Sequence, residues 1–316
     1  MSAEAPDRAV AELIADGGAA ASSAEFFRSP QFLAAEGVTH TLRIETAGGD
    51  ELLAPLVVRP IGEGPEHDAT SPYGFPGFAA PAGVVVDPAA VDFSATGLVS
   101  AFLRHRLGEP PLAGASPRNV VQVADPALPR KSRPSDRRQI RRNRERGYAL
   151  ELVPGAETSI EQRAGFVVLY EQTMRRTDAG RRYFFDPSYF DRVLSAERTW
   201  LALATDPKGE LAAASIATVS DGYLHYYLSG SADARLSDSP MKNVVAFLID
   251  HAEQLGLPLN LGGGINPADA LEDFKRGFAN REEQWLTSEV VCDPAAYERL
   301  SRGREAGGFF PAYRAP

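Results

Sequence analysis

The stretch LPLNLGGGINPADALEDFKRGF, residues 257–278, has the order expected of a strand, a glycine corner and a helix. Its first part is a short apolar run carried by Leu257, Leu259 and Leu261. The corner consists of Gly262, Gly263 and Gly264. Glycine has no side chain to keep a ligand or a second backbone at a distance. We therefore expect a close approach at this corner.

The second part of the stretch predicts a helix. Asn266 suits the helix cap, Pro267 suits the first helical position, and Asp269 favours the first turn. The apolar residues at helical spacing are Leu271, Phe274 and Phe278. Lys275 lies beside this stripe, so a cation follows a glycine corner, an arrangement that suits an acyl or phosphate group. Ordinary packing of a strand and a helix, with a lysine that reaches to solvent, gives the same pattern.

Composition limits the class of protein. The 316 residues suffice for two domains, and the apolar (44%) and charged (24%) contents are those of a soluble globular protein. No apolar run approaches the roughly 18 residues of a membrane span, and the acidic N-terminus does not resemble a signal peptide. Cys292 is the only cysteine, so an intrachain disulfide is excluded. We expect a cytoplasmic protein without integral membrane contact.

The net charge of −9 argues against a general nucleic-acid binder and against DNA as a partner. The 33 basic residues include only four lysines, which are Lys131, Lys208, Lys242 and Lys275. We interpret the arginine excess as the mark of a GC-rich genome. A lysine retained against that background gains some weight, which draws attention again to Lys275.

The N-terminal part of the chain predicts a mixture of elements. Residues 1–37 look helical, with apolar pieces at 9–14 and 26–33, and residues 39–45 and 52–58 look like strands. Pro55 indicates an edge position or a bulge in the second of these strands. A helix within residues 89–107 and a short strand at 119–123 follow.

The segment SPYGFPG, residues 71–77, is too broken for a regular element. Its aromatic residues, Tyr73 and Phe75, stand on a framework of proline and glycine. Such a segment can form the wall of a binding site. It can equally be a tight loop that buries both rings, and the sequence leaves the two interpretations open.

A basic helix is predicted at 135–146, after a linker at 125–134. Ser135 should cap it, and Ile140 should be its main apolar contact. Residues 130–146 contain nine basic and two acidic residues. A helix with so little apolar surface is normally solvated, although such a cluster on an acidic protein also suits phosphate groups.

The C-terminal part gives clearer signals. Ser159 and Gln162 form a capping-box pattern before one helix, and Pro187 starts another. The further elements are strands at 199–204, 211–219 and 223–229, a helix at 241–255 and a last strand at 284–292. The N-terminal part repeats a weaker version of this order. Two similar halves are therefore expected.

This order resembles the GNAT acyltransferase fold. The motifs that narrow the resemblance are YLHYYLSGS (223–231), LNLGGG (259–264), FKRGF (274–278), SPYGFPG (71–77) and TMRRTDAGRRYFFDPSYF (173–190). They are similar to those of the tandem-GNAT FemABX group and its GNAT acetyltransferase relatives. The resemblance implies an α/β fold with mixed sheets and two GNAT-like domains. We expect these at 1–128, in a degenerate form, and at 129–316.

The resemblance implies an enzyme that moves an aminoacyl group from aminoacyl-tRNA to an amine and forms an amide. The acceptor would be a peptidoglycan precursor or a natural-product intermediate of secondary metabolism. One departure is notable: residues 230–243, GSADARLSDSPMKN, hold one glycine where GNAT enzymes bind the coenzyme A pyrophosphate. An N-acyltransferase that uses an acyl-CoA thioester remains the alternative, and a non-catalytic binding protein on the same fold is a third.

The resemblance implies that Phe274 and Lys275 contact the donor and that Tyr226 and Tyr227 line the cleft, and the residue patterns described above supply further site residues. Those assigned to catalysis are Lys275, Phe274 and Tyr227. Those assigned to the donor are Gly262, Gly263, Gly264, Arg137, Arg138, Arg141 and Arg142. Those assigned to the acceptor are Tyr73, Phe75, Tyr226, Tyr183 and Asp178. Because side chains alternate along a strand, only one of Tyr226 and Tyr227 should face the site.

Aminoacyl transfer passes through a tetrahedral oxyanion, and the ester donor is already activated. Lys275 can stabilise that charge or hold the terminal phosphate of the tRNA, and the sequence does not separate these roles. The attacking amine must lose a proton. Candidate acceptors are His225, Asp178, Glu272, Asp273 and the substrate itself. We expect no metal and no cofactor other than the donor.

Overall fold

The computed structural model describes residues 8–108, 110–264 and 269–315. The chain divides into two compact units. Of the described residues, the first unit contains 8–22, 27–118 and 284–315, and the second unit contains 23–26 and 119–283. These units are not consecutive halves of the chain, and they differ from the predicted ranges 1–128 and 129–316 because residues 284–315 return to the first unit.

The sheet of the first unit begins at a short strand, β5 (Val91–Asp92), that runs parallel to β1 (Ala9–Ile14). From β1 the strands β2 (His40–Glu45), β3 (Glu51–Pro60) and β4 (His67–Thr70) follow in antiparallel order. β4 then pairs in parallel with β6 (Leu98–Arg104), and β6 pairs antiparallel with β13 (Arg281–Val291).

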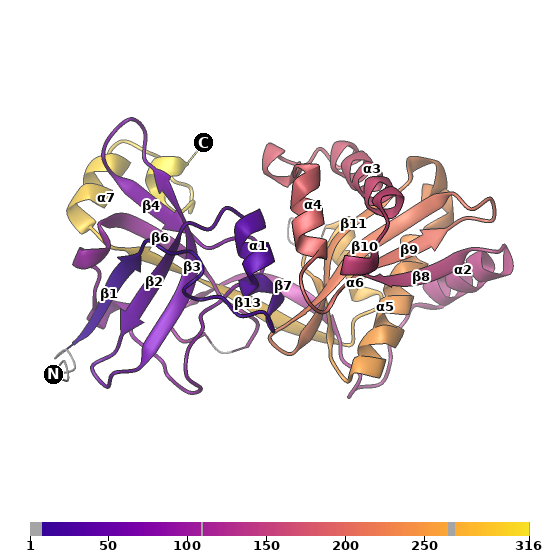
Figure 1. Ribbon diagram of the computed structural model, residues 1–316, viewed down its shortest axis with the longest axis horizontal. Coiled ribbons are helices and arrows are strands. Elements are labelled where there is room, and N and C mark those ends of the chain that lie inside the picture. Colours follow the sequence, from indigo (N-terminus) through magenta and orange to yellow (C-terminus); the bar gives the residue numbers. More distant parts are fainter. Residues whose placement is uncertain (1–7, 109, 265–268, 316) are drawn as a thin grey trace. The chain divides into compact units, whose positions relative to one another are not determined.

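The sheet of the second unit repeats this pattern (Figure 1). The strands β8 (Ala149–Pro154), β9 (Thr199–Thr205), β10 (Leu211–Ser220) and β11 (Tyr223–Ser231) are antiparallel. β11 then runs parallel to β12 (Leu259–Gly262), which pairs antiparallel with β7 (Ser116–Ala124). The strand after the parallel pair therefore comes from the other half of the chain in both units, which explains why a single cut cannot separate them.

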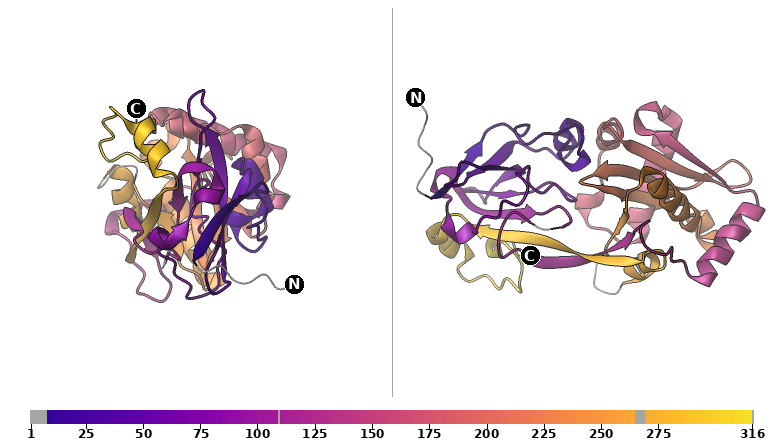
Figure 2. Two further views of the ribbon diagram at one scale, coloured as in Figure 1. Left: turned by 90° about the vertical axis from the view of Figure 1, so that its left-hand side faces the viewer. Right: turned by 90° about the horizontal axis from the view of Figure 1, so that it is seen from below.

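Helices cover both faces of the second sheet (Figures 1 and 2). On one face, α3 (Ile160–Arg176) packs on β10 and β11, and α4 (Pro187–Leu194) packs on β9. On the other face, α5 (Met241–Leu255) covers a core of small and branched residues and contacts α2 (Pro134–Glu145). The short helix α6 (Ala270–Arg276) contributes Phe274 to the edge of that core. Ala202 and Ala204 alternate with Leu201 and Leu203 along β9, so one strand serves two layers.

The first unit carries fewer helices. α1 (Pro30–Ala35) begins at Ser29, whose hydroxyl accepts from the Phe32 amide. α7 (Pro294–Ser301) and a 3-10 helix (Ala312–Arg314) follow β13. Their contact residues form a small satellite core with Ile61 and Val99. The main core of this unit lies on its sheet, with Leu42, Ile44, Leu52, Leu56 and Leu103 fully buried.

Two predicted helices are wrong. Residues 9–14 form β1, and residues 89–107 contain β5 and β6 together with 3-10 turns at Pro88–Ala90 and Ser94–Thr96. Both segments pair with neighbouring strands along their length, and this pairing overrides their local helix preference. Pro55 is also not at an edge, since β3 lies between β2 and β4. β4 pairs with β3 only from Val57 onward, which leaves room for a residue without an amide hydrogen.

The helix boundaries give mixed results. The capping box of Ser159 and Gln162 is present at the start of α3, and α4 and α5 lie where they are predicted. Ser135 does not cap α2, because Arg133 occupies the cap position and Pro134 is the first helical residue. The predicted cap at Asn266 and the predicted first position at Pro267 lie outside the described residues. Within them, Asp269 caps α6 and accepts from the Glu272 amide.

Within the described residues, none of the helices has both the length and the apolar character that crossing a membrane requires.

Candidate acyl-transfer site

The candidate site lies where β11 and β12 separate. Among the described residues their parallel ladder holds two pairs, Leu224 with Leu259 and His225 with Asn260, whereas β11 continues to Ser231. Beyond these pairs β11 carries a bulge, because Ile216 of β10 faces Leu228 and Ala217 faces Tyr226. Tyr227 is the extra residue, and a bulge of this kind bends a strand and redirects a side chain.

The glycine corner packs against β7. Gly262 has a left-handed φ of +74°, which favours glycine. A Cβ atom on Gly263 would lie 2.5 Å from the Val120 carbonyl oxygen, closer than carbon and oxygen can approach. The Asn119 amide donates to the Gly264 carbonyl over 3.0 Å. These glycines could allow the close approach of a ligand or of a second backbone. The neighbour observed at Gly263 is the backbone of β7.

Lys275 points at this corner from α6. Its Nζ atom donates to the Gly263 carbonyl oxygen over 2.7 Å and lies 3.2 Å from where a Gly262 Cβ would be. Only 7% of the residue is exposed, and this burial lowers the pKa of the ammonium to about 8, although Asp269 acts in the opposite direction. Leu271, predicted to face the core, is 38% exposed. The helix therefore turns its lysine inward and a leucine outward.

A chain of hydrogen bonds supports the corner from the other face of the sheet. The His225 Nε2 atom lies 3.1 Å from the Ser220 carbonyl, and its Nδ1 atom lies 3.1 Å from the Asn260 amide nitrogen. The Asn260 side-chain oxygen accepts from the Gly262 amide over 2.8 Å. Burial lowers the pKa of His225 to about 4, so its ring is neutral at neutral pH. With both ring nitrogens engaged, His225 is a poor candidate for the proton acceptor.

The two tyrosines of β11 lie on opposite faces, as their alternation predicts. Tyr226 packs against the α5-side core, its hydroxyl donates to Ser229 over 2.6 Å, and burial raises its pKa to about 12. Tyr227 faces the α3 and α4 side, where its hydroxyl meets that of Tyr189 and its ring lies 5.3 Å from Phe26. Tyr227 thus belongs to an aromatic layer on the α3 and α4 face.

Three further predicted site residues have surroundings of their own. Phe274 packs at the edge of the α5-side core with its ring 5.6 Å from Phe278. Tyr183 follows α3, accepts from the Tyr170 hydroxyl through its carbonyl, and is covered by the Arg182 guanidinium. Asp178 is exposed and has a positive φ of 50°.

The segment 71–77 belongs to the first unit. Phe75 lies between Phe27 and Trp285, with ring centroids 5.6 Å from each. Tyr73 is more exposed, and its amide donates to the Glu36 carboxylate over 2.8 Å. Phe75 therefore fits the tight-loop interpretation, whereas Tyr73 lies at the surface of its unit.

Two of the carboxylates considered as proton acceptors are engaged. Glu272 pairs with Arg276 one turn along α6. Asp273 accepts two bonds from Arg133, at 2.7 and 2.9 Å, and this guanidinium lowers the pKa of the carboxyl. Asp273 is thereby stabilised as an anion, which makes it a weaker base.

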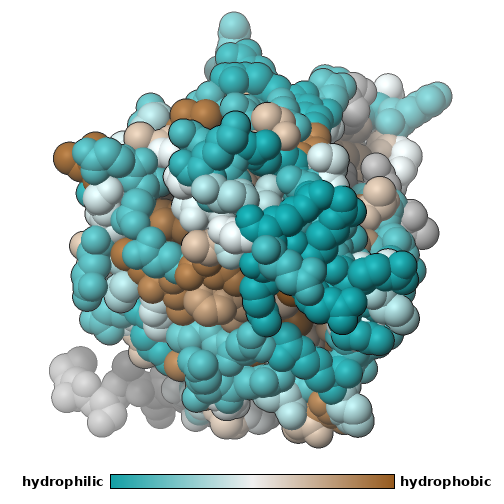
Figure 3. Space-filling model, turned by 90° about the vertical axis from the view of Figure 1, so that its right-hand side faces the viewer, coloured by the Kyte–Doolittle hydropathy of each residue, from teal (hydrophilic) through white to brown (hydrophobic). Residues whose placement is uncertain are grey.

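The basic helix α2 is attached by one face only. Asp136 forms an ion pair with Lys242 at 2.9 Å, and the Asn143 side-chain amide donates to the Asn243 side-chain oxygen over 2.8 Å. The predicted donor residues on the other face, Arg137, Arg138, Arg141 and Arg142, are all exposed. The view of the molecule that includes this helix is largely hydrophilic (Figure 3). The helix therefore presents guanidinium groups that remain accessible to a polyanion.

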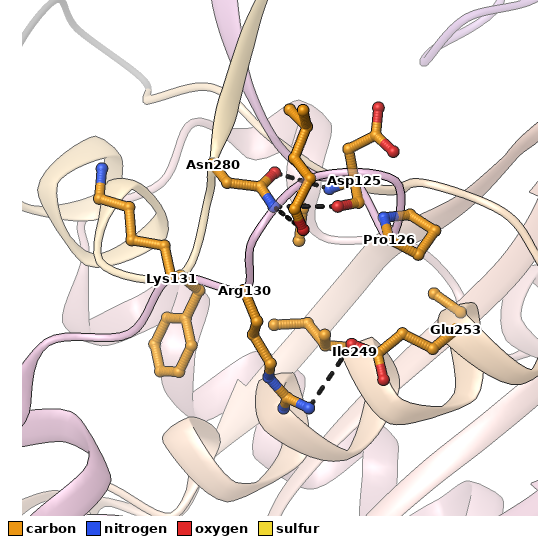
Figure 4. Close-up of a pocket in the computed structure, with 11 residues that line it drawn as sticks. Asp125, Pro126, Arg130, Lys131, Ile249, Glu253 and Asn280 are labelled. Carbon is orange, nitrogen blue, oxygen red and sulfur yellow. Dashed lines mark hydrogen bonds and ion pairs between the residues drawn. The ribbon is translucent and has the colours of Figure 1, made fainter.

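The Asn280 side chain anchors the predicted linker before α2 (Figure 4). Asn280 accepts from the Asp125 amide over 2.8 Å and donates to the Asp125 and Pro129 carbonyls over 2.9 and 3.2 Å. Arg130 extends across the same shallow pocket toward Asp250 and Glu253. The start of α2 is thereby fixed within the second unit.

The segment between β11 and α5 carries two aspartates that pair with residues of other elements. It contains a 3-10 helix (Asp233–Asp238). Asp233 pairs with Arg176, and Asp238 accepts from Arg146 over 2.7 Å and from the Tyr148 hydroxyl over 2.8 Å. Carboxylates therefore occupy the region that precedes the N-terminus of α5.

Two buried residues near the corner were not singled out from the sequence. Asn260 is fully enclosed in β12, and Gln122 of β7 is fully buried opposite Gly262. The Gln122 side chain donates to Glu282 over 2.9 Å. The available signal is a polar residue inside an apolar strand run, as in LNLG, because a buried amide must have partners.

Comparisons with known proteins identify the fold that carries this site. Residues 130–276 match the family model described as an acetyltransferase (GNAT) domain. The crystal structure of FemX matches with a TM-score of 0.57 and 12% identity, over 82% of this chain and 90% of that one. The chain has a GNAT acyltransferase fold. The FemABX-like resemblance in fold and the mixed α/β fold class are thereby confirmed. The domain match over residues 130–276 supports the predicted acyltransferase class.

Two further solved structures have a similar fold. The L-PGS structure from Bacillus licheniformis matches with a TM-score of 0.51 and 11% identity, over 83% of this chain and 90% of that one. The C-terminal domain of a putative lysylphosphatidylglycerol synthetase from Agrobacterium fabrum matches with a TM-score of 0.53 and 11% identity, over 84% and 87%. The comparison with curated protein sequences finds no match.

Proposed function

We propose that this GNAT protein transfers an aminoacyl group from aminoacyl-tRNA to an amine and forms an amide bond. The observation that carries the proposal is the buried Lys275 ammonium, held at Gly263 where β11 and β12 separate. A fixed cation in a water-poor place interacts strongly with a developing negative charge. The attacking nitrogen joins the carbonyl carbon, the ester C–O bond breaks, and the tRNA leaves through its ribose hydroxyl.

Lys275 can serve the donor in two ways, and both use the same atom. Its Nζ atom can stabilise the oxyanion of the tetrahedral intermediate, or it can hold the terminal phosphate of the tRNA. Because its pKa is about 8, the group is mostly protonated at neutral pH and fit for either role. Phe274 and Tyr227 remain proposed site residues, with Phe274 supporting α6 and Tyr227 closing the aromatic side.

The choice of tRNA over coenzyme A has support from the segment before α5. A pyrophosphate would need backbone amides and positive charge there. Asp233 and Asp238 instead place two carboxylates in this segment, each neutralised by an arginine. An incoming pyrophosphate would have to displace these ion pairs and would meet like charges.

The exposed face of α2 fits the other requirement of a tRNA donor. Its four arginines, Arg137, Arg138, Arg141 and Arg142, stand on successive turns of one helix. Binding a polyanion to such a face releases condensed counterions, so affinity falls steeply with salt. We place the tRNA backbone on this helix and the acylated 3′ end at the corner.

An acyl-CoA-dependent N-acyltransferase is the second candidate. The match of residues 130–276 to the acetyltransferase (GNAT) domain favours it. The two candidates share the chemistry at Lys275 and differ in how the donor is held.

One experiment decides between them. The purified protein is incubated with total tRNA charged with labelled amino acids and with a panel of amines, with and without ribonuclease. We expect labelled amide product that ribonuclease abolishes. Transfer from acetyl-CoA that resists ribonuclease would contradict the first candidate and support the second. Failure with both donors would favour a non-catalytic binding role.

The panel of acceptors is chosen from the classes of acceptor proposed for this enzyme. It includes peptidoglycan precursors and small natural-product amines as the proposed acceptors. Phosphatidylglycerol is tested beside the amines, because the name of one similar structure contains lysylphosphatidylglycerol; its hydroxyl would give an ester in place of an amide. The residues proposed to meet the acceptor are Tyr73, Phe75, Tyr226, Tyr183 and Asp178.

A further inference from the structure

The hydrogen bonds behind the glycine corner fix one protonation state of His225. The Ser220 carbonyl can only accept, so the Nε2 atom 3.1 Å away carries the ring hydrogen. The Nδ1 atom must then accept from the Asn260 amide, also at 3.1 Å. The Asn260 oxygen is thereby turned toward the Gly262 amide, which donates to it over 2.8 Å. The imidazole decides which way the Asn260 amide faces.

The backbone at this point needs such an anchor. The β12–β7 ladder pairs Asn260 with Val123 and Gly262 with Gln122, so one residue of β12 is extra. A side chain that binds the amide two residues ahead is the asparagine turn that stabilises an irregular backbone. Gly262 then takes its φ of +74°. This turn of the backbone brings Gly263 against Val120 of β7 and within reach of the Lys275 Nζ atom.

We propose that Asn260, oriented by His225, is a positioning residue that sets the location of the Lys275 ammonium through the Gly262–Gly263 backbone. The proposal rests on the proposed function only in giving Lys275 a reaction to serve. Neither residue touches the donor in this scheme. The corner carries the effect, because the Gly263 carbonyl is the acceptor that holds Nζ at 2.7 Å.

Charged and aromatic groups lie close to the two titrating residues, His225 and Lys275. Asp221 and the Tyr223 ring lie near His225, and Asp269 lies near Lys275. Asp221 raises the pKa of His225 and Asp269 raises that of Lys275, and burial outweighs both. A looser corner admits water and removes part of the burial. The Lys275 pKa should then move up from about 8 toward its ordinary value.

Competitive labelling tests the proposal without any substrate. The chain has four lysines, so an amine-reactive reagent followed by peptide mass spectrometry gives a titration curve for each one. We compare the full-length protein with Asn260→Ala and Asn260→Asp. In Asn260→Ala the Lys275 midpoint should rise by about one pH unit, while those of Lys131, Lys208 and Lys242 stay in place.

Asn243→Ala is the matched control. Asn243 is as buried as Asn260 and holds the Ile140 carbonyl and Asn143, away from the corner. It should lower stability to a similar extent and leave the Lys275 midpoint unchanged. Asn260→Asp keeps an acceptor for the Gly262 amide and invites the opposite tautomer of His225. The Lys275 midpoint of Asn260→Asp should therefore lie close to that of the wild type. This variant also serves as the test if Asn260→Ala is too unstable to interpret.

Turnover provides the second readout. Once transfer is detected, Asn260→Ala should lower kcat about tenfold with little change in the KM of the donor, because one misplaced group is lost from the transition state. A Lys275 midpoint that is equal in the wild type, Asn260→Ala and Asn243→Ala would overturn the proposal. Absence of any transfer would overturn the proposed function instead and would leave the labelling result to decide this one.

Discussion

Two segments of the second unit follow the diverging strands, and they are built in opposite ways. The segment between β11 and α5 carries Asp233 and Asp238, and each carboxylate is paired with an arginine. The corner between β12 and α6 carries a buried lysine whose described partner is a backbone carbonyl. The carboxylates of the first are neutralised by Arg146 and Arg176 from neighbouring elements, whereas the second faces the Lys275 cation of α6. On this difference we base the proposal that an anionic group is recognised at the corner and not at the start of α5.

The largest expected effect comes from removing that cation. Lys275→Met keeps the length of the side chain and should lower kcat by about 100- to 1,000-fold, the range seen when one oxyanion contact is lost. Steady-state transfer from charged tRNA measures it. Lys208→Met, on the exposed turn between β9 and β10, is the control and should be neutral. Equal activity of the two variants would remove Lys275 from the site.

The next effect concerns α2. Replacing its four exposed arginines, Arg137, Arg138, Arg141 and Arg142, by glutamine should raise the KM for charged tRNA about 30-fold at physiological salt and flatten its salt dependence. The turnover at saturating tRNA should persist, because these residues lie away from the corner. Arg175→Gln, which removes an exposed partner of Glu171 on α3, is the control for charge alone. A KM that stays constant would mean that the arginine face is merely solvated.

How much of the fold could be predicted from the sequence depends on whether local or distant contacts determine each element. The meander of β9, β10 and β11 and the helices α3, α4 and α5 follow from apolar periodicity and caps, which are local. AVAELI at 9–14 contains good helix formers, and only its pairing with β2 makes it a strand. The division into units escaped because β7 and β13 each pair with strands far away in the sequence.

The site shows the same limit at the scale of one residue. FKRGF indicates a cation near the glycines, but α6 has only seven residues and packing decides its inward face. That packing buries Lys275 and exposes Leu271, although Phe274 and Phe278 of the predicted stripe do pack on the core. Asn260 went unnoticed because its role depends on His225, 35 positions earlier, and on a bulge that no periodicity records.

A smaller effect should appear in the pH dependence. If the protonated Lys275 acts, the transfer rate should fall by about tenfold between pH 7 and pH 9, since burial lowers its pKa to about 8. The sign follows from the charge: raising the pH removes the proton and with it the cation. The pH–rate profile measures this fall, with an acceptor amine whose protonation does not change between pH 7 and pH 9. Lys275→Arg keeps the charge and should be weaker at pH 7 but flat to pH 9. A wild-type profile that is equally flat would contradict the cationic role.

The smallest expected effect tests the other member of the comparison. Asp238→Asn should keep a hydrogen bond to Tyr148 and weaken the pair with Arg146, and it should lower the free energy of unfolding by about 1 kcal/mol. Urea unfolding measures this loss, and transfer from tRNA should stay within twofold. The same variant removes one negative charge before α5, so it offers coenzyme A its best chance to bind. We expect no shift of the unfolding midpoint with millimolar coenzyme A in either protein. A shift in the variant alone would show that the carboxylate is what excludes the pyrophosphate, and a shift in both would move anion recognition to the start of α5.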